Sequence, residues 1–466
     1  MSKTAVVLGA GVTGLSVAWK LSERGWDVHI VESRPDIGGM SSCFEWKGMR
    51  LDYGPHKMYS QLPVFSEVMS LFNEEELNRI PKKSRIRLLD KFFDYPLKTQ
   101  QLLVKVNPVK SSEFVMSYGM ATARNMVASK EDTNYETYMI NRFGNSIYSA
   151  VFGPYAAKAW GDPQKLDKSL AESRIAVPSL LEMLKRMVIG NKGQPELSAS
   201  EFHYPKKGVD EISRKMLAKS KNVKLHLSSK VKKIKFDNHR ISSLEVESGG
   251  NAETLNADFV ISTIPLKSLS RLFNDIPESV SESLDNLNLR RLMLVMIEAG
   301  KERLFTDNWI FFPESKYIFN RISEQKGFSH SMVGDGKTVL CVEVTTDENS
   351  HILKMSDEQV MSECLVGLND CGIMGNDDVK DYKVVRMGNA YPVYSIGYKD
   401  HLYNVLRHIE SHGNIVSIGR QGMFSYTGMM DCIDMGFKTA EFVDSGKPIA
   451  DWVKVRTGFE NYVTID

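Results

Sequence analysis

The chain begins with a strand–turn–helix–strand pattern, and this pattern restricts its fold more than any other feature of the sequence. Residues 6–8 are an apolar run that predicts a buried strand, and a helical pattern then runs to about Arg24. Three glycines with GxGxxG spacing separate the two: Gly9, Gly11 and Gly14. A second apolar strand, residues 28–31, ends at Glu32. A βαβ unit of this kind predicts a parallel sheet covered by helices.

Each part of this unit has a chemical reason. Gly9 permits the tight turn, Gly11 lets backbone N–H groups approach a pyrophosphate, and Gly14 lets the helix pack closely on the strand. The helix N-terminus supplies positive potential for phosphates. Glu32 can accept hydrogen bonds from both hydroxyls of an adenosine ribose, and its charge would repel a 2′-phosphate. The unit therefore predicts a dinucleotide site and argues against NADP there.

The residues that follow Glu32 favour FAD over NAD. Arg34 and then Gly38-Gly39 resemble the FAD-binding oxidoreductases of the amine oxidase and protoporphyrinogen oxidase type, in which the extra glycines pass close to the flavin diphosphate and ribityl chain. Later segments resemble the rest of that fold: a hairpin at 230–236, a returning strand at 257–265, a last strand at 415–419 and a helix at 431–443. The resemblance implies FAD as the cofactor, with Val231 and Gly419 among its contacts.

Length and composition describe an ordinary globular protein. The 466 residues suffice for two or three domains, and 42% are hydrophobic while 25% are charged. A net charge of +1 gives no indication of a nucleic-acid or acidic-membrane partner. The five cysteines show no CxxC spacing and no metal cluster is predicted, and neither a signal peptide nor an apolar run of about 18 residues is visible. We therefore expect a reducing, cytoplasmic setting.

The predicted fold class is α/β, with a discontinuous Rossmann-like domain and two further domains. The FAD-binding domain is expected to comprise residues 1–90, 203–270 and 388–447. Residues 91–202 are expected to form a mainly helical domain, with helices at 111–127, 135–152 and 172–189. Residues 271–387 are expected to form an antiparallel sheet, with strands at 292–298, 309–312, 317–322 and 339–345 and a hairpin turn at Asp335-Gly336. Residues 448–466 are a C-terminal tail.

Segments between residues 52 and 431 resemble one branch of these flavoproteins, the UDP-galactopyranose mutases. The sequence DYGPHKM at 52–58 resembles the GPH loop that bacterial mutases place beside the flavin ring. In that loop Gly54 would permit close approach to the isoalloxazine. His56 could donate a hydrogen bond toward the flavin or the sugar.

Residues 152–163, FGPYAAKAWGDP, resemble the aromatic-x-x-K-x-W-G/A segment of the mutases, and Arg174 follows as it does there. The resemblance implies that Trp160 lines a nucleotide-sugar site and that Arg174 reaches the substrate diphosphate. A guanidinium binds phosphate oxygens bidentately and stays charged, so the assignment is also chemically sound.

Residues 308–313 and 319–321 resemble the WxYFP…YR segment of the eukaryotic-type mutases, and they imply substrate contacts by Trp309 and Arg321. In the family the tyrosine and the arginine contact the diphosphate. This chain carries Phe311 in place of that tyrosine. Phe311 cannot donate a hydrogen bond, so one phosphate contact is lost or replaced.

Two C-terminal segments complete the resemblance. Residues 389–394 are similar to the YPxP/YPxY turn, whose first tyrosine, here Tyr391, points at the substrate phosphates. Residues 417–426 are similar to GRxGxxxY, in which Arg420 would lie near the flavin and diphosphate and Tyr426 would bind phosphate. The sequence after Tyr426 departs from the family pattern.

The resemblance implies a mutase, an isomerase in which FAD reduced by NAD(P)H or another donor attacks the anomeric carbon of a nucleotide-diphosphate sugar through N5. His56, Arg174 and Arg420 are then the expected catalytic residues, and a homo-oligomer stays open. A true FAD oxidase or dehydrogenase is the second hypothesis, and a flavin-bound protein without catalysis is the third. The arginines distinguish the mutase from the oxidase or dehydrogenase, because a hydrophobic or amine substrate needs no site for an anion.

Overall fold

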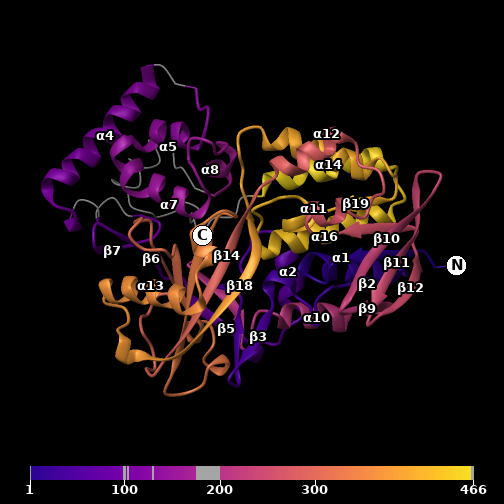
Figure 1. The fold of residues 1–466 in the computed structure, drawn as a ribbon, viewed down its shortest axis with the longest axis horizontal. Helices are drawn as coiled ribbons and strands as arrows, with labels where there is room; N and C mark the ends of the chain where they lie inside the picture. Colours follow the sequence, from indigo (N-terminus) through magenta and orange to yellow (C-terminus); the bar gives the residue numbers. More distant parts are fainter. Residues whose placement is uncertain (1, 98–100, 102–103, 128–130, 175–199, 463–466) are drawn as a thin grey trace. The chain divides into compact units, whose positions relative to one another are not determined.

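The computed structural model describes residues 2–97, 101, 104–127, 131–174 and 200–462. The chain forms two compact units, each built from segments distant in sequence (Figure 1). Unit 1 comprises Met1–Asn78, His203–Leu287 and Gly397–Thr464. Unit 2 comprises Arg79–Phe202 and Asn288–Ile396. The α/β fold class is confirmed, whereas the division into three domains and a tail stays a prediction.

Unit 1 is built on a parallel sheet of five strands with β1 at its centre. In sheet order the strands are β19 (Ile415–Ser417), β13 (Phe259–Ser262), β1 (Thr4–Leu8), β2 (Asp27–Val31) and β9 (Val223–His226). All but the first residue of β1 are buried, as expected for a central parallel strand covered on both faces. The strands expected at 6–8, 28–31, 257–265 and 415–419 are thereby confirmed.

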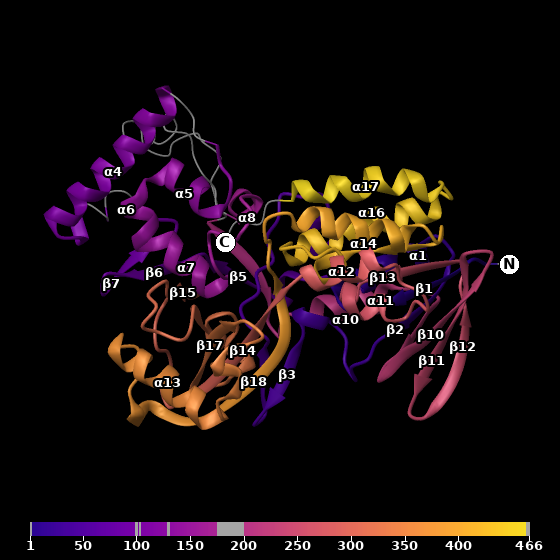
Figure 2. The same ribbon diagram turned by 45° about the horizontal axis from the view of Figure 1, so that its top comes forward.

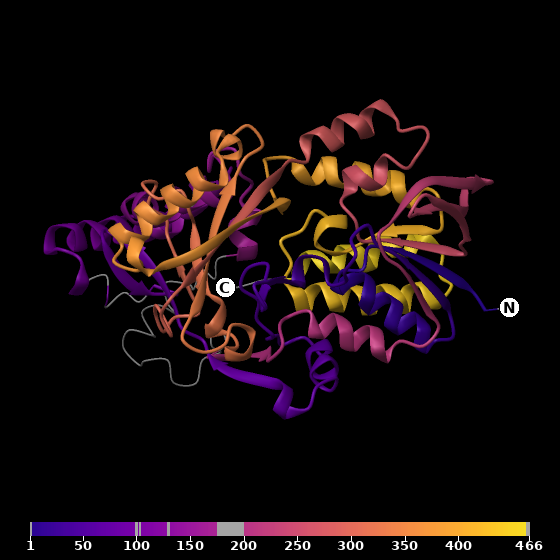
Figure 3. The same cartoon turned by 60° about the horizontal axis from the view of Figure 1, so that its bottom comes forward.

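Helix α1 (Val12–Glu23) follows β1 and packs against α16 (Met429–Asp444) and α10 (Glu211–Lys219), as Figure 3 shows. The contact with α16 is close, since a Cβ added to Gly436 would lie 1.9 Å from Ser16 Oγ. The other helices of unit 1 are α2 (Val64–Met69), α11 (Leu266–Ser270), α12 (Glu278–Asn286), α14 (Tyr398–Glu410), α15 (Gly419–Gly422) and α17 (Trp452–Gly458). Its 3-10 turns are η1 (Gly39–Ser41), η2 (Glu74–Glu76), η8 (Ile449–Asp451) and η9 (Phe459–Asn461).

Two small antiparallel sheets complete unit 1. One is the expected hairpin with an added strand: β10 (Ser229–Asp237), β11 (Arg240–Ser248) and β12 (Asn251–Asn256). The other pairs β3 (Cys43–Trp46) with β4 (Met49–Asp52). The chain passes from one unit to the other within β5 (Leu77–Pro81) and β8 (Glu201–Pro205).

Unit 2 contains a sheet of seven strands, on which α13 (Asp357–Asp370) packs (Figure 2). In sheet order the strands are β18 (Val379–Pro392), β14 (Leu289–Ala299), β17 (Thr338–Thr346), β16 (Arg321–Glu324), β15 (Trp309–Phe311), β6 (Ser84–Leu88) and β7 (Lys91–Asp94). Pairing is antiparallel except between β15 and β6. Four 3-10 turns accompany the sheet: η4 (Gln325–Gly327), η5 (His330–Met332), η6 (His351–Lys354) and η7 (Asn376–Asp378).

Two predictions for this sheet are wrong. The strand expected at 317–322 begins only at Arg321, because residues 312–319 form the loop between β15 and β16. Asp335-Gly336 lies in a connection containing η4 and η5 rather than in a two-residue hairpin turn. The strands expected at 292–298, 309–312 and 339–345 correspond to β14, β15 and β17.

The helices of unit 2 are α4 (Pro108–Val127), α5 (Tyr135–Phe143), α6 (Asn145–Ile147), α7 (Gly153–Ala159) and α8 (Ser169–Arg174), with a π-helical turn, η3 (Tyr148–Phe152), before α7. The single helix expected at 135–152 is wrong, because Gly144 interrupts it with φ 78°. A Cβ at Gly144 would lie 2.4 Å from the Ser117 carbonyl oxygen, so close packing on α4 dictates the break. Residues 175–189 of the third expected helix lie outside the described residues. Among the residues described, no helix has the length and apolarity needed to span a bilayer.

Candidate functional site

The glycine-rich turn between β1 and α1 has one position where backbone is open to a ligand. A Cβ on Gly14 would lie 2.0 Å from the Gly9 carbonyl oxygen, so the fold itself requires glycine there. A Cβ on Gly11 would meet only Gly39 Cα, at 4.0 Å. The space beside Gly11, at the N-terminus of α1, therefore suits an approaching phosphate.

Glu32 is fixed beside this turn by both of its carboxylate oxygens. Oε2 accepts from the Ala10 N–H and Oε1 from the Arg34 N–H, each at 2.9 Å. Oε1 also accepts from the Ser33 hydroxyl at 3.2 Å, so Oε2 is the oxygen that keeps a further lone pair for a ribose hydroxyl. The Ser229 N–H donates to the Glu32 carbonyl at 2.9 Å, which brings the start of β10, and with it the nearby Val231, to the same region.

A second glycine segment lies against the first. The Gly38 N–H donates to the Ala10 carbonyl at 2.8 Å. The Arg34 guanidinium donates to the Gly39 carbonyl at 3.4 Å and to the Tyr53 hydroxyl at 3.3 Å. Arg34 thus joins the Gly38-Gly39 segment to the residue that precedes Gly54.

A buried carboxylate organises the GPH loop. Asp52, 1% exposed at the end of β4, accepts from the Tyr204 hydroxyl at 2.6 Å, the Cys43 thiol at 3.0 Å and the Val209 N–H at 3.3 Å. Burial, and then the Asp52 charge, raise the pKa of the Tyr204 phenol and of the Cys43 thiol, so both stay protonated and donate. His56 Nδ1 lies 3.5 Å from Asp52 Oδ2. The His56 imidazole thus lies near a carboxylate that is itself fixed by three donors.

The loop reverses direction at Gly54, which has φ 92° and donates its N–H to the Asp52 carbonyl at 2.9 Å. A left-handed conformation of this kind favours glycine. The same carboxylate residue thus holds the loop through its backbone as well as through its side chain.

The C-terminal arginine segment adjoins the glycine turn. Gly419 has φ 79°, and a Cβ there would lie 2.7 Å from Thr13 Oγ1 in the first turn of α1. Arg420 donates to the Thr427 carbonyl at 2.9 Å, and its guanidinium lies 5.3 Å from the ring centre of the buried Tyr426. The bond to the Thr427 carbonyl fixes the orientation of the guanidinium.

In unit 2, Phe311 and four other aromatic side chains form a cluster, here called the Phe311 cluster. The ring centres of Tyr95 and Phe311 are 4.9 Å apart, and Tyr155 lies edge-on to Phe311 at 5.8 Å and to Trp160 at 5.5 Å. Tyr135 lies 5.8 Å from Trp160. The predicted substrate residue Trp160 therefore belongs to an aromatic surface that is held together by edge-to-face contacts.

Trp309 contacts different side chains. It is 3% exposed in β15, its ring centre lies 6.1 Å from that of Phe202, and the Lys82 ammonium lies 5.9 Å from the ring. These contacts are those of a core residue, and its substrate role stays a prediction.

Arg321 is engaged by a carboxylate. Its Nε and Nη2 donate to the two oxygens of Glu343 at 2.6 and 2.9 Å, and Glu343 is 1% exposed. This bidentate pair neutralises the guanidinium. A substrate phosphate would have to compete with Glu343 for it.

The two other predicted substrate residues of unit 2 lie on different elements. Arg174 is the half-buried last residue of α8. Tyr391 stands near the end of β18, opposite Arg290 of β14. Arg290 is 8% exposed and donates to the Lys158 carbonyl at 2.9 Å, which links this strand to α7.

Unit 1 brings the predicted cofactor residues together, through the contacts of the two glycine segments, Glu32, Arg34, Gly54 and Gly419. The predicted catalytic and substrate residues are divided between the units. Unit 1 holds His56, Arg420 and Tyr426, and unit 2 holds Trp160, Arg174, Trp309, Arg321 and Tyr391. Their action on one substrate stays a prediction.

The charged residues that were not assigned a role from the sequence include Asp52 and Glu343, which are buried, and Lys158, which is half-buried. Asp52 and Lys158 stand inside the motifs quoted above, where a charge among apolar and glycine residues was the available signal. Glu343 interrupts the apolar run of β17, whose nine residues are all buried, and this interruption is the signal that could have found it.

Comparison with known families matches residues 12–443 to the flavin containing amine oxidoreductases. A 1-hydroxycarotenoid 3,4-desaturase of Flavobacterium sp. (strain P99-3) is 23% identical over 286 residues, and the match spans 56% of this chain and 56% of that protein. A 4,4'-diaponeurosporene oxygenase of Staphylococcus aureus (strain Mu50 / ATCC 700699) is 22% identical over 386 residues, 75% of this chain and 73% of that protein.

Solved structures share the fold over nearly the whole chain. A reduced UDP-galactopyranose mutase has a TM-score of 0.83 with 21% identity, covering 99% of this chain and 100% of the other. A putative protoporphyrinogen oxidase from Exiguobacterium sp. 255-15 has a TM-score of 0.74 with 16% identity, covering 96% and 100%. Identities this low establish the fold alone. The family match covers most of the chain, so the protein belongs to the flavin-containing amine oxidoreductase family, with FAD as its cofactor.

Proposed function

We propose that the protein is a flavin-dependent mutase that interconverts the pyranose and furanose forms of a nucleotide-diphosphate sugar. The observation that carries this proposal is the position of Arg420. It directly follows Gly419, which packs on the first turn of α1, so a guanidinium oriented by a neutral carbonyl adjoins the cofactor turn. A guanidinium in that place could bind the diphosphate of a substrate, separate from that of the cofactor.

The residues take the following roles in this proposal. Arg420 and Arg174 bind the substrate diphosphate, Tyr426 and Tyr391 donate to it, and Trp160 with the Phe311 cluster contacts the nucleotide sugar. Arg321 contributes less, because Glu343 neutralises it. His56, held beside Asp52, donates toward the cofactor or the sugar.

When bound and reduced by NAD(P)H or another donor, FAD would supply a nucleophilic N5 for the anomeric carbon of the sugar. The protein then has two tasks, which are to hold the anomeric carbon in the reactive geometry and to retain the diphosphate while the ring opens and recloses. Fixed cations serve the second task best, since they need no reorganisation when charge develops on the leaving group.

A second candidate is an FAD-dependent oxidoreductase acting on an apolar substrate. Two observations favour it: Phe311 replaces a hydrogen-bonding tyrosine within an aromatic cluster, and Glu343 cancels the charge of Arg321. The sequence relatives include a 1-hydroxycarotenoid 3,4-desaturase and a 4,4'-diaponeurosporene oxygenase. A cytoplasmic location and a homo-oligomer stay predictions under either candidate.

Incubating dithionite-reduced protein with a panel of nucleotide sugars distinguishes the two. The mutase forms ring-size isomers without net oxidation, which chromatography detects. Unaltered sugars, together with hydrogen peroxide release or electron transfer from an apolar substrate, would replace the mutase by the oxidoreductase. Oxidised protein is the matched control, because the mutase requires the reduced flavin.

A further inference from the structure

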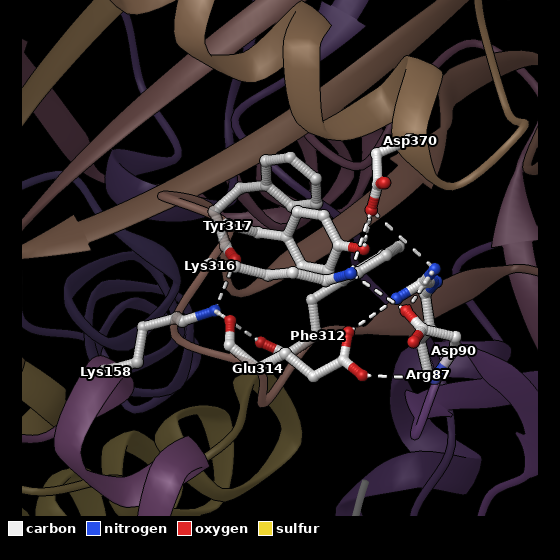
Figure 4. Close-up of polar contacts among 9 residues, drawn as sticks. Arg87, Asp90, Lys158, Phe312, Glu314, Lys316, Tyr317 and Asp370 are labelled. Carbon is white, nitrogen blue, oxygen red and sulfur yellow. Dashed lines mark hydrogen bonds and ion pairs between the residues drawn. The ribbon is translucent and has the colours of Figure 1, made fainter.

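Lys158 is a half-buried lysine whose ammonium binds three backbone carbonyls of one loop. It lies on α7, and its Nζ donates to the carbonyl oxygens of Phe312 at 2.8 Å, Glu314 at 2.5 Å and Phe319 at 3.1 Å (Figure 4). An ammonium has three N–H groups, so these three acceptors use all of them. The bonds join α7 to the loop between β15 and β16, here called the 312–319 loop.

The 312–319 loop is also held from its other side by charged side chains (Figure 4). The buried Arg87 of β6 donates to the Glu314 carboxylate at 2.5 Å. Lys316 pairs with Asp90 at 2.8 Å and with Asp370 at 3.0 Å. These contacts attach the loop to β6 and α13 and do not involve α7. Of the bonds named here, those of Lys158 are the ones that reach α7.

The two elements joined by Lys158 carry or adjoin three members of the Phe311 cluster. Tyr155 precedes Lys158 on α7 and Trp160 follows it, while Phe311 ends β15 immediately before the loop. Tyr155 meets Phe311 edge-on at 5.8 Å. The Lys158 backbone is fixed as well, because its carbonyl accepts from Arg290 of β14. Residue 158 is thus held at both its backbone and its side chain, close to the rings.

We propose that Lys158 is a positioning residue, whose ammonium sets the distance and orientation of Tyr155 on α7, and of Trp160 directly after the helix, relative to Phe311. The inference rests on the proposed function insofar as these rings contact the nucleotide sugar. Lys158 itself is enclosed by the loop carbonyls and acts through the rings. Loss of the ammonium contact is expected to change substrate affinity more than turnover.

The charge on Lys158 provides a way to test this role. Burial lowers the pKa of Lys158 to about 7, while the Glu314 carboxylate and the Cys371 thiol oppose the shift. At lower pH the ammonium serves all three carbonyls. At higher pH the neutral amine has two N–H groups and directs a lone pair at the remaining oxygen. Of the other charged and titratable groups, Arg290 of β14 contacts the Lys158 carbonyl. The loop that Lys158 binds carries Lys316 and Tyr317 and is contacted by Arg87, Asp90 and Asp370.

The first measurement is backbone amide exchange in the FAD-loaded wild type, Lys158→Met and the matched control Lys316→Met. Lys158→Met should accelerate exchange about tenfold in both α7 and the 312–319 loop, because charge-assisted bonds are lost. Lys316→Met should accelerate exchange in the loop while α7 keeps the wild-type rate. Unchanged exchange in α7 of Lys158→Met, or an equal acceleration throughout both units, would overturn the proposal.

The second measurement follows the ring position directly. In 5-fluorotryptophan-labelled protein the Trp160 resonance, assigned with Trp160→Phe, should shift with a midpoint near pH 7 in the wild type. Lys158→Arg, which stays charged, should show no such midpoint. A wild-type Trp160 resonance that does not respond in this range would refute the positioning role, even if Lys158→Met fails to fold. Neither measurement uses a sugar nucleotide. Absence of mutase activity would therefore contradict the proposed function without contradicting the role of Lys158.

Discussion

Glu343 holds Arg321 through two parallel hydrogen bonds, at 2.6 and 2.9 Å, in a position where the carboxylate is almost completely buried. We expect Glu343→Leu to destabilise the protein by about 3 kcal/mol, because it leaves a poorly solvated guanidinium without its partner. Arg321→Met should cost a similar amount, and the double variant should cost much less than the sum. Urea denaturation of the four proteins measures this coupling, and additive losses would contradict it.

Alanine substitutions at two glycines of the cofactor turn are expected to have different effects. Gly14→Ala should destabilise the fold, because its Cβ would lie 2.0 Å from the Gly9 carbonyl oxygen. Gly11→Ala should fold normally, since its Cβ would have no protein atom closer than 4.0 Å, yet it should lower FAD affinity by occupying the phosphate space. Thermal denaturation of the apoproteins and flavin titration separate the two effects. Equal flavin affinity in Gly11→Ala and wild type would exclude phosphate approach at Gly11.

Removal of the Asp52 charge should disturb the GPH loop. In Asp52→Asn an amide group would face the donors of Tyr204 and Cys43, so we expect a loss of about 2 kcal/mol in the free energy of unfolding. Tyr204→Phe is the control and should cost about 1 kcal/mol, because it removes one hydrogen bond and leaves the carboxylate in place. Denaturant unfolding measures both, and a smaller loss for Asp52→Asn than for Tyr204→Phe would count against the central role of Asp52.

Arg420→Lys should weaken binding of a nucleotide-diphosphate sugar about tenfold or more while the protein keeps its flavin. Lysine retains the charge but loses the planar pair of donors. Calorimetric titration measures substrate affinity and the visible spectrum measures flavin content. Complete flavin loss would instead assign Arg420 to the cofactor site.

Thiol reactivity should follow burial. Burial and the neighbouring Asp52 and Asp210 carboxylates raise the pKa of Cys43, whereas Cys371 is only half-buried and its pKa is raised mainly by partial burial. At mildly alkaline pH a disulfide reagent should therefore modify Cys371 first and leave Cys43 as the unreactive thiol. Peptide mass spectrometry of the native protein checks this order, and unfolded protein provides the control in which all five cysteines react. Early modification of native Cys43 would argue against its buried position.

The βαβ unit at the N-terminus could be predicted because its information is local. Gly9, Gly14 and Glu32 lie within one short segment, and each has a function within that segment. The strands β14, β15 and β17 were predictable for the same reason, since an apolar run marks a buried strand wherever it pairs.

Features that depend on distant partners could not be predicted. The break at Gly144 depends on the Ser117 carbonyl of another helix. The loop before Arg321 was mistaken for a strand because its aromatic residues pack on the sheet while its carbonyls bind Lys158, which is 154 residues away from Phe312. The sequence shows a glutamate at position 343. Predicting that it pairs with Arg321 would have required the register in which β16 and β17 pair.

The carbonyl contacts of Lys158 have an evolutionary consequence. Since the ammonium recognises main-chain oxygens, any residue type can supply them, and side chains between Phe312 and Phe319 can change in related sequences without loss of the contact. Divergence in this loop is therefore compatible with an unchanged helix, whereas position 158 itself tolerates little replacement. In related sequences we therefore expect lysine at position 158 together with a loop of variable composition.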